Sequence, residues 1–127
     1  MSTFTTQGIK VLTKPFYIAE ESDPENNHYV FGYEIAIVNE GDRPAQLIDR
    51  HWIIIDGENH REEVKGEGVV GNQPTLEPGQ SFVYRSYCPL STDYGIMRGT
   101  YGMVRPDGER FEATIAPFVL MPHWMLN

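Results

Sequence analysis

The sequence predicts an all-β protein, folded as an antiparallel β-sandwich of about seven strands. Its 12 glycines and 9 prolines are spread so evenly through 127 residues that only one stretch of 12 residues, 45–56, contains neither. A typical α-helix is about 11 or 12 residues long. That one stretch holds three consecutive isoleucines, whose branching at Cβ favours a strand. Long helices are therefore not expected.

Strands are predicted near residues 9–13, 28–39, 45–55, 62–69, 80–87, 97–105 and 110–116. The second has a period of two, typical of a strand with one buried face, and its apolar face consists of Phe31, Tyr33, Ile35 and Ile37. Turns that contain glycine or proline separate the later strands, at residues 40–42, 56–57, 77–79 and 106–108.

Trp52, in the third predicted strand, suits the large aromatic residue that immunoglobulin-like sandwiches bury between their sheets. The segment 76–79, Leu-Glu-Pro-Gly, resembles the turns that lead into the strands of such sandwiches. The expected fold is an immunoglobulin-like or fibronectin type III-like antiparallel β-sandwich. At this length we expect a single domain that spans residues 1–127.

The composition disfavours two classes of partner. Ten Lys and Arg against 18 Asp and Glu give a net charge of −8, which repels nucleic acids and anionic membranes at long range. Cys88 is the only cysteine, so the chain can form no internal disulfide, and no apolar run approaches the roughly 18 residues of a membrane span. We expect a soluble cytoplasmic protein that binds neither nucleic acid nor membrane.

Residues 66–71, Gly-Glu-Gly-Val-Val-Gly, match the G-x-G-x-x-G pattern of dinucleotide-binding folds. That pattern needs a helix after its glycines to hold the pyrophosphate, and Pro74 and Pro78 prevent one here. Gly66, Gly68 and Gly71 could still present backbone N–H groups to a phosphate or another anion. The alternative, which we favour, is that these glycines permit a bulge, a tight turn or a close backbone approach.

The residue types used in metal binding and covalent catalysis form no recognisable pattern. The four histidines lack metal-ligand spacing, and the acidic segment 56–63 lacks the spacing of a calcium loop. Cys88 lies in no nucleophile signature, and no G-x-S-x-G motif is present. The sequence therefore predicts no metal, no cofactor and no catalytic residue.

The third strand carries apolar residues on both faces, although a sandwich strand needs only one. Strict alternation places Ile48, Trp52 and Ile54 on one face and Leu47, Ile53 and Ile55 on the other, with His51 opposite Trp52. The segment 118–126 is equally apolar for a chain end and includes Trp124. These features predict a partner-binding surface that includes His51, Ile53, Ile55 and Trp124. The alternatives are a structural His51 and a C-terminal segment that covers its own sheet.

Several longer segments closely resemble the ApaG family over nearly the whole chain. They are residues 50–56, 66–71 with Gln73 and Pro74, 76–80, 89–92 and 95–97, and single positions that continue to Leu126 and Asn127. The chain departs from the family pattern at Asn72, Tyr87 and Asp93-Tyr94.

The resemblance implies a compact β-sandwich found alone in bacteria and appended to F-box and polymerase-interacting proteins in eukaryotes. It implies an interaction module, with links to diadenosine polyphosphate hydrolysis through name and gene neighbourhood and to cobalt and magnesium tolerance through genetics. No agreed biochemical activity comes with the family.

We therefore expect a non-enzymatic module that binds a protein partner, or self-associates, through a sheet face or edge. The alternative is a sensor that binds a nucleotide polyphosphate or pyrophosphate at residues 66–71.

Overall fold

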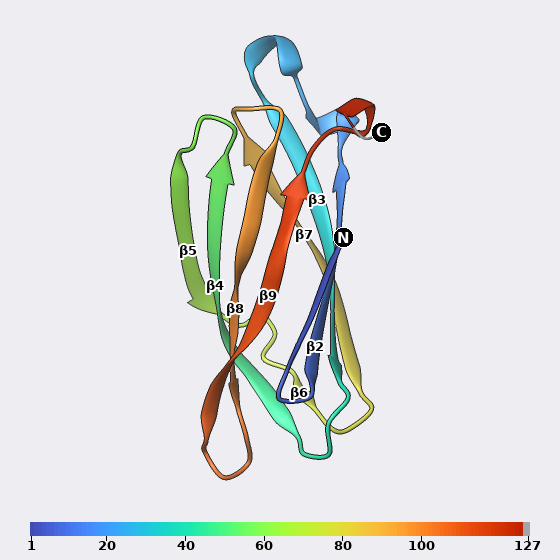
Figure 1. The fold of residues 1–127 in the computed structure, drawn as a ribbon, viewed down its shortest axis with the longest axis vertical. Helices are drawn as coiled ribbons and strands as arrows, with labels where there is room; N and C mark the ends of the chain where they lie inside the picture. The colour runs from blue at the N-terminus through green and yellow to red at the C-terminus, as the bar shows by residue number, and fades with distance from the viewer. Residues whose placement is uncertain (126–127) are drawn as a thin grey trace.

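The protein is a sandwich of two antiparallel sheets (Figure 1). The computed structural model describes residues 1–125. The strands are β1 (Ser2–Thr6), β2 (Ile9–Tyr17), β3 (Tyr29–Asn39), β4 (Ala45–Asp56), β5 (Arg61–Glu67), β6 (Thr75–Leu76), β7 (Ser81–Leu90), β8 (Gly95–Val104) and β9 (Arg110–Leu120). Three single 3-10 turns complete the described structure: η1 (Ala19–Glu21), η2 (Pro24–Asn26) and η3 (His123–Met125).

One sheet has the strand order β1-β2-β3-β7, and the other has the order β5-β4-β8-β9 with β6 also paired to β4. In Figure 1, β5, β4, β8 and β9 lie in one layer and β2, β3 and β7 in the layer behind them. The loop that carries η1 and η2 projects beyond the end of β3. None of the helical turns in residues 1–125 is long and apolar enough to cross a lipid bilayer.

The predicted antiparallel sandwich is confirmed, and each of the seven predicted strands is present. The prediction missed two strands, β1 and β6. The first is a short run of serine, threonine and one phenylalanine, and it pairs with β2 through a tight turn at Gln7 and Gly8, where both residues have positive φ. Such turns form two-residue hairpins. β6 has only two residues, too few for any periodicity to be visible.

The core lies between the two sheets and contains a cluster of aromatic rings. Trp52 is 3% exposed, and its ring centroid lies 5.5 Å from that of Tyr33 and 5.9 Å from that of Phe118. The predicted burial of Trp52 is therefore confirmed. The hydroxyl groups of Tyr84 and Tyr101 share a hydrogen bond within this cluster, and burial raises the pKa of both side chains. A shared hydrogen bond lets two buried hydroxyls leave water at a small cost.

The prediction of which residues share a face of β4 is wrong for the first half of the strand. Leu47 was expected on the same face as Ile53, but Leu47 is fully buried together with Trp52. The reason is a bulge between Leu47 and Asp49, which leaves Ile48 out of the pairing with β8 and reverses the alternation. Because of the bulge, odd-numbered residues such as Leu47 are buried before it and even-numbered residues such as Trp52 are buried after it.

Candidate functional site

The glycine-rich segment 66–71 ends in a tight turn. The backbone N–H of Val69 donates to the Asn72 carbonyl at 2.8 Å, and the N–H of Asn72 donates back to Val69 at 2.9 Å. Val70 and Gly71, between them, have φ values of 42° and 81°. Two consecutive positive φ values are the geometry of a two-residue hairpin turn. Gly71 is therefore explained by the positive φ that this turn requires.

The other two glycines of this segment make room for neighbouring groups. A Cβ on Gly68 would collide with the Asn72 carbonyl, and one on Gly66 would lie 2.8 Å from the Arg50 guanidinium. That guanidinium donates through Nη1 to the carbonyls of Glu67, at 3.0 Å, and Gly68, at 2.9 Å. The expectation of a tight turn with close backbone approach is confirmed.

The same segment holds the bulge of β4 in place. The carbonyl of Ile48 accepts hydrogen bonds from the N–H of Gly68 and from Nε2 of Gln73, both at 2.8 Å. A bulged residue loses its partner in the sheet, and a buried carbonyl without a partner is costly. Gly68 in this segment and Gln73 just beyond it thus supply the donors to the bulged residue. Anion binding by Gly66, Gly68 and Gly71 stays a prediction, and one of the three N–H groups, that of Gly68, already donates to Ile48.

A shallow depression of about 590 Å³ lies beside Gly66. Its lining consists of Asp49, Arg50, His51, Lys65, Gly66, Glu67, Thr100, Arg110 and Glu112. We call it the charged depression. Arg110, from β9, donates to both carboxylate oxygens of Asp49 on β4, at 2.8 and 3.0 Å, and to Glu112 at 3.0 Å. These hydrogen bonds from Arg110 hold the pKa of Asp49 below its usual value.

Gly102 on β8 makes this ion pair possible. It lies in register between Asp49 on β4 and Glu112 on β9, and a Cβ there would collide with both Asp49 and Arg110. Sequence reasoning missed Arg110 and Gly102. A glycine inside a predicted strand does signal close approach of another group. No sequence signal indicates that Arg110 would reach a residue 61 positions away.

Three of the four predicted partner-binding residues lie together on the outer face of the β5-β4-β8-β9 sheet. His51 borders the charged depression, and its Nε2 lies 3.7 Å from the Glu63 carboxylate with no hydrogen bond within residues 1–125. Ile53 and Ile55 are half-buried on the same face.

These isoleucines belong to a larger apolar surface. Ile55 is in register with Ile96 on β8, which is in register with Val119 on β9. Ile96 is 38% exposed and Val119 43%. We call Ile53, Ile55, Ile96 and Val119 the apolar row. Sequence reasoning did not single out Ile96, and it included Val119 only as part of the apolar segment 118–126, because the alignment of the two with Ile55 depends on the register of three strands.

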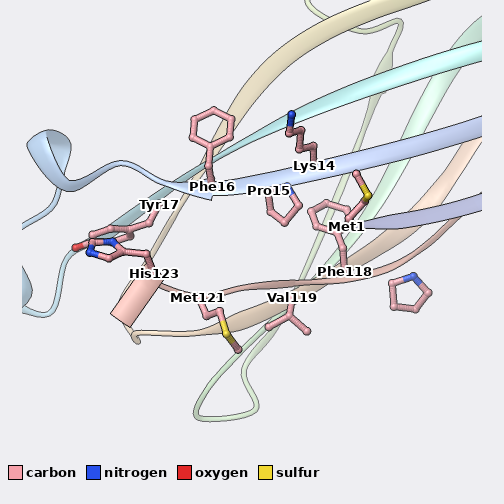
Figure 2. A pocket seen from close by; sticks show the side chains of 10 residues that line it. Met1, Lys14, Pro15, Phe16, Tyr17, Phe118, Val119, Met121 and His123 are labelled. Atoms are coloured by element: carbon pink, nitrogen blue, oxygen red, sulfur yellow. The ribbon is translucent and has the colours of Figure 1, made fainter. Parts of the chain in front are cut away.

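Trp124 lies elsewhere, on the C-terminal turn η3. Its ring meets Tyr17 of β2 edge-on, with centroids 5.2 Å apart, and the side chain stays 54% exposed. Close by, a groove of about 720 Å³ runs between β2 and β9 (Figure 2), lined on the β9 side by Phe118, Val119 and Met121. The end of the chain thus packs partly on its own sandwich. Leu126, also in the predicted apolar segment, lies outside the described residues.

The residue types considered for metal binding and covalent catalysis lie dispersed or in structural contacts among residues 1–125. No group of three or more His, Cys, Asp or Glu side chains is placed to hold a metal ion there. Burial raises the pKa of the Cys88 thiol to about 11, so it stays protonated at neutral pH. Asp56 accepts hydrogen bonds from the N–H groups of Glu58 and His60 and so closes the β4–β5 turn.

Comparison with known proteins gives consistent matches. The model of a family described as "ApaG domain" matches residues 19–105. The chain is 53% identical over 127 residues to "Protein ApaG" of Anaeromyxobacter dehalogenans strain 2CP-C, with all of both chains covered. It is 54% identical over 120 residues to "Protein ApaG" of Dechloromonas aromatica, with 94% of each chain covered.

Two solved structures extend the comparison. A crystal structure of the putative ApaA protein from Bordetella pertussis superposes with a TM-score of 0.89 at 51% identity and covers 91% of this chain and 94% of its own. The C-terminal domain of wzt superposes with a TM-score of 0.56 at 11% identity, covering 95% of this chain and 77% of that one. At that identity the second likeness concerns the fold alone.

Proposed function

The chain belongs to the ApaG domain family, and we propose that it is a non-enzymatic module that binds a protein partner through the outer face of the β5-β4-β8-β9 sheet. The observation that carries this proposal is the apolar row, which crosses three neighbouring strands and leaves Ile96 and Val119 exposed beside the charged depression. Exposed apolar surface with a polar border is typical of interaction sites.

The charged depression supports the same proposal because its charges are held in place before a partner arrives. Arg110 is fixed by two carboxylates, from Asp49 and Glu112. Fixed charges at the border of an interface add specificity more than affinity, and the buried apolar centre supplies the affinity. The protonated Cys88 thiol supports a role without covalent catalysis.

The test compares single substitutions on the two sheets. Ile96→Lys and Val119→Lys should remove a partner that co-purifies with the wild-type protein from its native cell, or should abolish self-association measured by sedimentation equilibrium. The matched control is Val83→Lys on β7, at a position that is 53% exposed on the opposite sheet. Retention of every partner and of the wild-type oligomeric state by both row variants would contradict the proposal.

A second candidate is a sensor of nucleotide polyphosphates or pyrophosphate at residues 66–71. It is favoured by one observation: the basic residues Lys65 and Arg110 line the depression beside Gly66. Titration with a diadenosine polyphosphate should then shift the amide NMR signals of Gly66, Gly68 and Gly71 in a saturable manner, and Lys65→Gln should weaken the effect. Unchanged signals at millimolar ligand would exclude this candidate.

Three finer assignments belong to the same proposal. The strand orders β2-β3-β7 and β5-β4-β8-β9 support an immunoglobulin-like or fibronectin type III-like topology. The single buried Cys88 supports a reducing compartment, the cytoplasm. A role in cobalt or magnesium tolerance rests on the family resemblance alone, and the net charge of −8 supports a protein partner over nucleic acid or membrane.

A further inference from the structure

The outer face of the opposite sheet carries a second, unassigned pocket. It encloses about 510 Å³ where the η1–η2 loop meets β3 and β7, and it is lined by Ile18, Glu21, His28, Val30, Tyr87 and Pro89. Four of these six residues are apolar or aromatic. We call it the loop pocket.

Two partly exposed aromatic side chains extend this apolar surface, and the Arg85 guanidinium lies 5.8 Å from the centre of the ring of one of them, Phe16. Phe16 on β2 and Tyr87 on β7 are both in register with Gly32 on β3, and a Cβ on Gly32 would collide with the Phe16 ring. Phe16 is 40% exposed and Tyr87 70%. Figure 2 shows the Phe16 side chain projecting away from the residues of β9, which places its ring on the outer face. An aromatic surface left open in this way is typical of a binding site.

The border of the loop pocket is strongly acidic. The loop carries Glu20, Glu21, Asp23 and Glu25, all exposed, and no lysine or arginine occurs from residue 15 to residue 42. Within the described residues none of these four carboxylates forms a salt bridge. Their charge is therefore free to attract a positively charged ligand.

We propose that the loop pocket docks a short basic segment of another protein, with one aromatic or aliphatic side chain in the pocket and lysine or arginine side chains against Glu20, Glu21 and Glu25. Charge decides between the possible occupants. A second copy of this chain would bring a further net charge of −8 and, on a two-fold axis, a second acidic loop. This surface lies on the sheet opposite the apolar row, so the inference adds a second partner and makes the protein a bridge between two proteins.

The test uses three fluorescein-labelled peptides of defined sequence, read by fluorescence anisotropy. They are Lys-Arg-Trp-Lys-Arg, the same peptide with glycine in place of tryptophan, and Glu-Glu-Trp-Glu-Glu. The first should bind in a saturable manner and should weaken at least tenfold between 50 mM and 200 mM salt, because its contacts are charged. The other two should bind at least tenfold more weakly.

Variants assign the binding to the pocket. The triple variant Glu20→Gln, Glu21→Gln, Glu25→Gln should lower affinity for the basic peptide at least tenfold, and Tyr87→Ser should do the same with little effect on folding because Tyr87 is so exposed. The matched controls are Glu77→Gln, Val83→Ser and Ile96→Lys, which should bind as the wild type does. The two proposals can therefore fail separately. Loss of the apolar-row partner in Ile96→Lys would not change peptide binding at the loop pocket, and loss of peptide binding in the pocket variants would not change binding at the apolar row.

Three outcomes would overturn the proposal. The first is equal binding of the basic and acidic peptides, and the second is unchanged binding in both pocket variants. The third is wild-type self-association that Tyr87→Ser abolishes, because it would assign this face to a second copy of the chain. Amide NMR shifts centred on residues 18–30 and 85–89 would support the proposal, and shifts centred on the charged depression would refute it.

Discussion

The two sheets of this sandwich differ in the regularity of their pairing. In the β1-β2-β3-β7 sheet, β3 pairs with β2 and with β7 without interruption. In the β5-β4-β8-β9 sheet, β4 and β8 are interrupted by a bulge at Leu47/Asp49, and β8 and β9 by a shift between Met97 and Gly99. The regular sheet leaves aromatic side chains open on its outer face, and the irregular sheet forms a charged depression there. Irregular pairing thus accompanies an ion pair fixed beside the apolar row, whereas regular pairing accompanies exposed aromatic side chains with an acidic border.

Glycines make the same distinction. In the irregular sheet, a Cβ on Gly99 would collide with the backbone carbonyl of His51. In the regular sheet, a Cβ on Gly32 would collide with the exposed ring of Phe16, which is free to turn away. Only the first contact involves rigid backbone, so the two sheets should tolerate the same substitution differently.

The largest expected effect therefore comes from Gly99→Ala. It should lower the free energy of unfolding by about 3 kcal/mol or more, because the backbone of two paired strands must separate, whereas Gly32→Ala should cost about 1 kcal/mol. Urea unfolding followed by tryptophan fluorescence measures both. Equal losses in the two variants would mean that the sheets do not differ in rigidity.

The next largest effect concerns the segment that supports the bulge. Gly68→Ala should cost about 2–3 kcal/mol, because it combines a φ of 62° with a collision against the Asn72 carbonyl. Gly71→Ala meets open space and should cost only the left-handed backbone strain, about 1 kcal/mol. The same urea experiment applies. A more harmful Gly71→Ala would refute the assignment of the bulge support to Gly68.

A smaller effect is expected for the coupling energies of two ion pairs, one on the outer face of each sheet. Asp49 and Arg110 form a two-point contact on one face, and Glu34 and Arg85 form a single contact of 3.2 Å on the other. A double-mutant cycle should give a coupling energy of about 0.5–1 kcal/mol for the first pair and about 0.3 kcal/mol or less for the second, since both are solvent-exposed. The reverse order would mean that Gly102 does not help to hold the first pair together.

The smallest effect is on the acid dependence of stability. Because Arg110 lowers the pKa of Asp49 in the folded protein, the stabilisation is present above the unfolded value of about 3.9 and is lost as pH falls through the lower folded pKa. Asp49→Asn should therefore lose less unfolding free energy than the wild type between about pH 4 and pH 2, by under 1 kcal/mol for this exposed pair. Arg110→Gln should behave in the same way. Parallel pH profiles in wild type and both variants would contradict the pKa shift.

The regular sheet was easier to predict from sequence than the irregular one. Strict alternation gave the buried face of β3 correctly, since nothing interrupts its pairing. The same rule failed for Leu47 and Ile48, because the bulge depends on donors from Gly68 and Gln73, which lie 20 or more residues away in sequence.

The candidate sites were predicted only in part. His51, Ile53 and Ile55 could be proposed together from sequence because one strand contains them all, and the structure places them on one face. Arg110 and Tyr87 were missed as site residues, because each becomes important only through the register of strands far apart in sequence. A single sequence contains no direct record of that register.

Interruptions of the outermost strands determine how another chain can approach this molecule. On one side of β4, the partner strand is β5 along one part and β6 along another. The residues between these two strands, 68–74, form no continuous strand. At the far side of that sheet, β9 contains Pro117, which has no N–H to donate. The other border is β5, where five of the seven residues are charged, so this sheet resists the strand-by-strand growth that leads to aggregation. Recognition by this sheet is thereby left to side chains, whose chemistry can distinguish one partner from another.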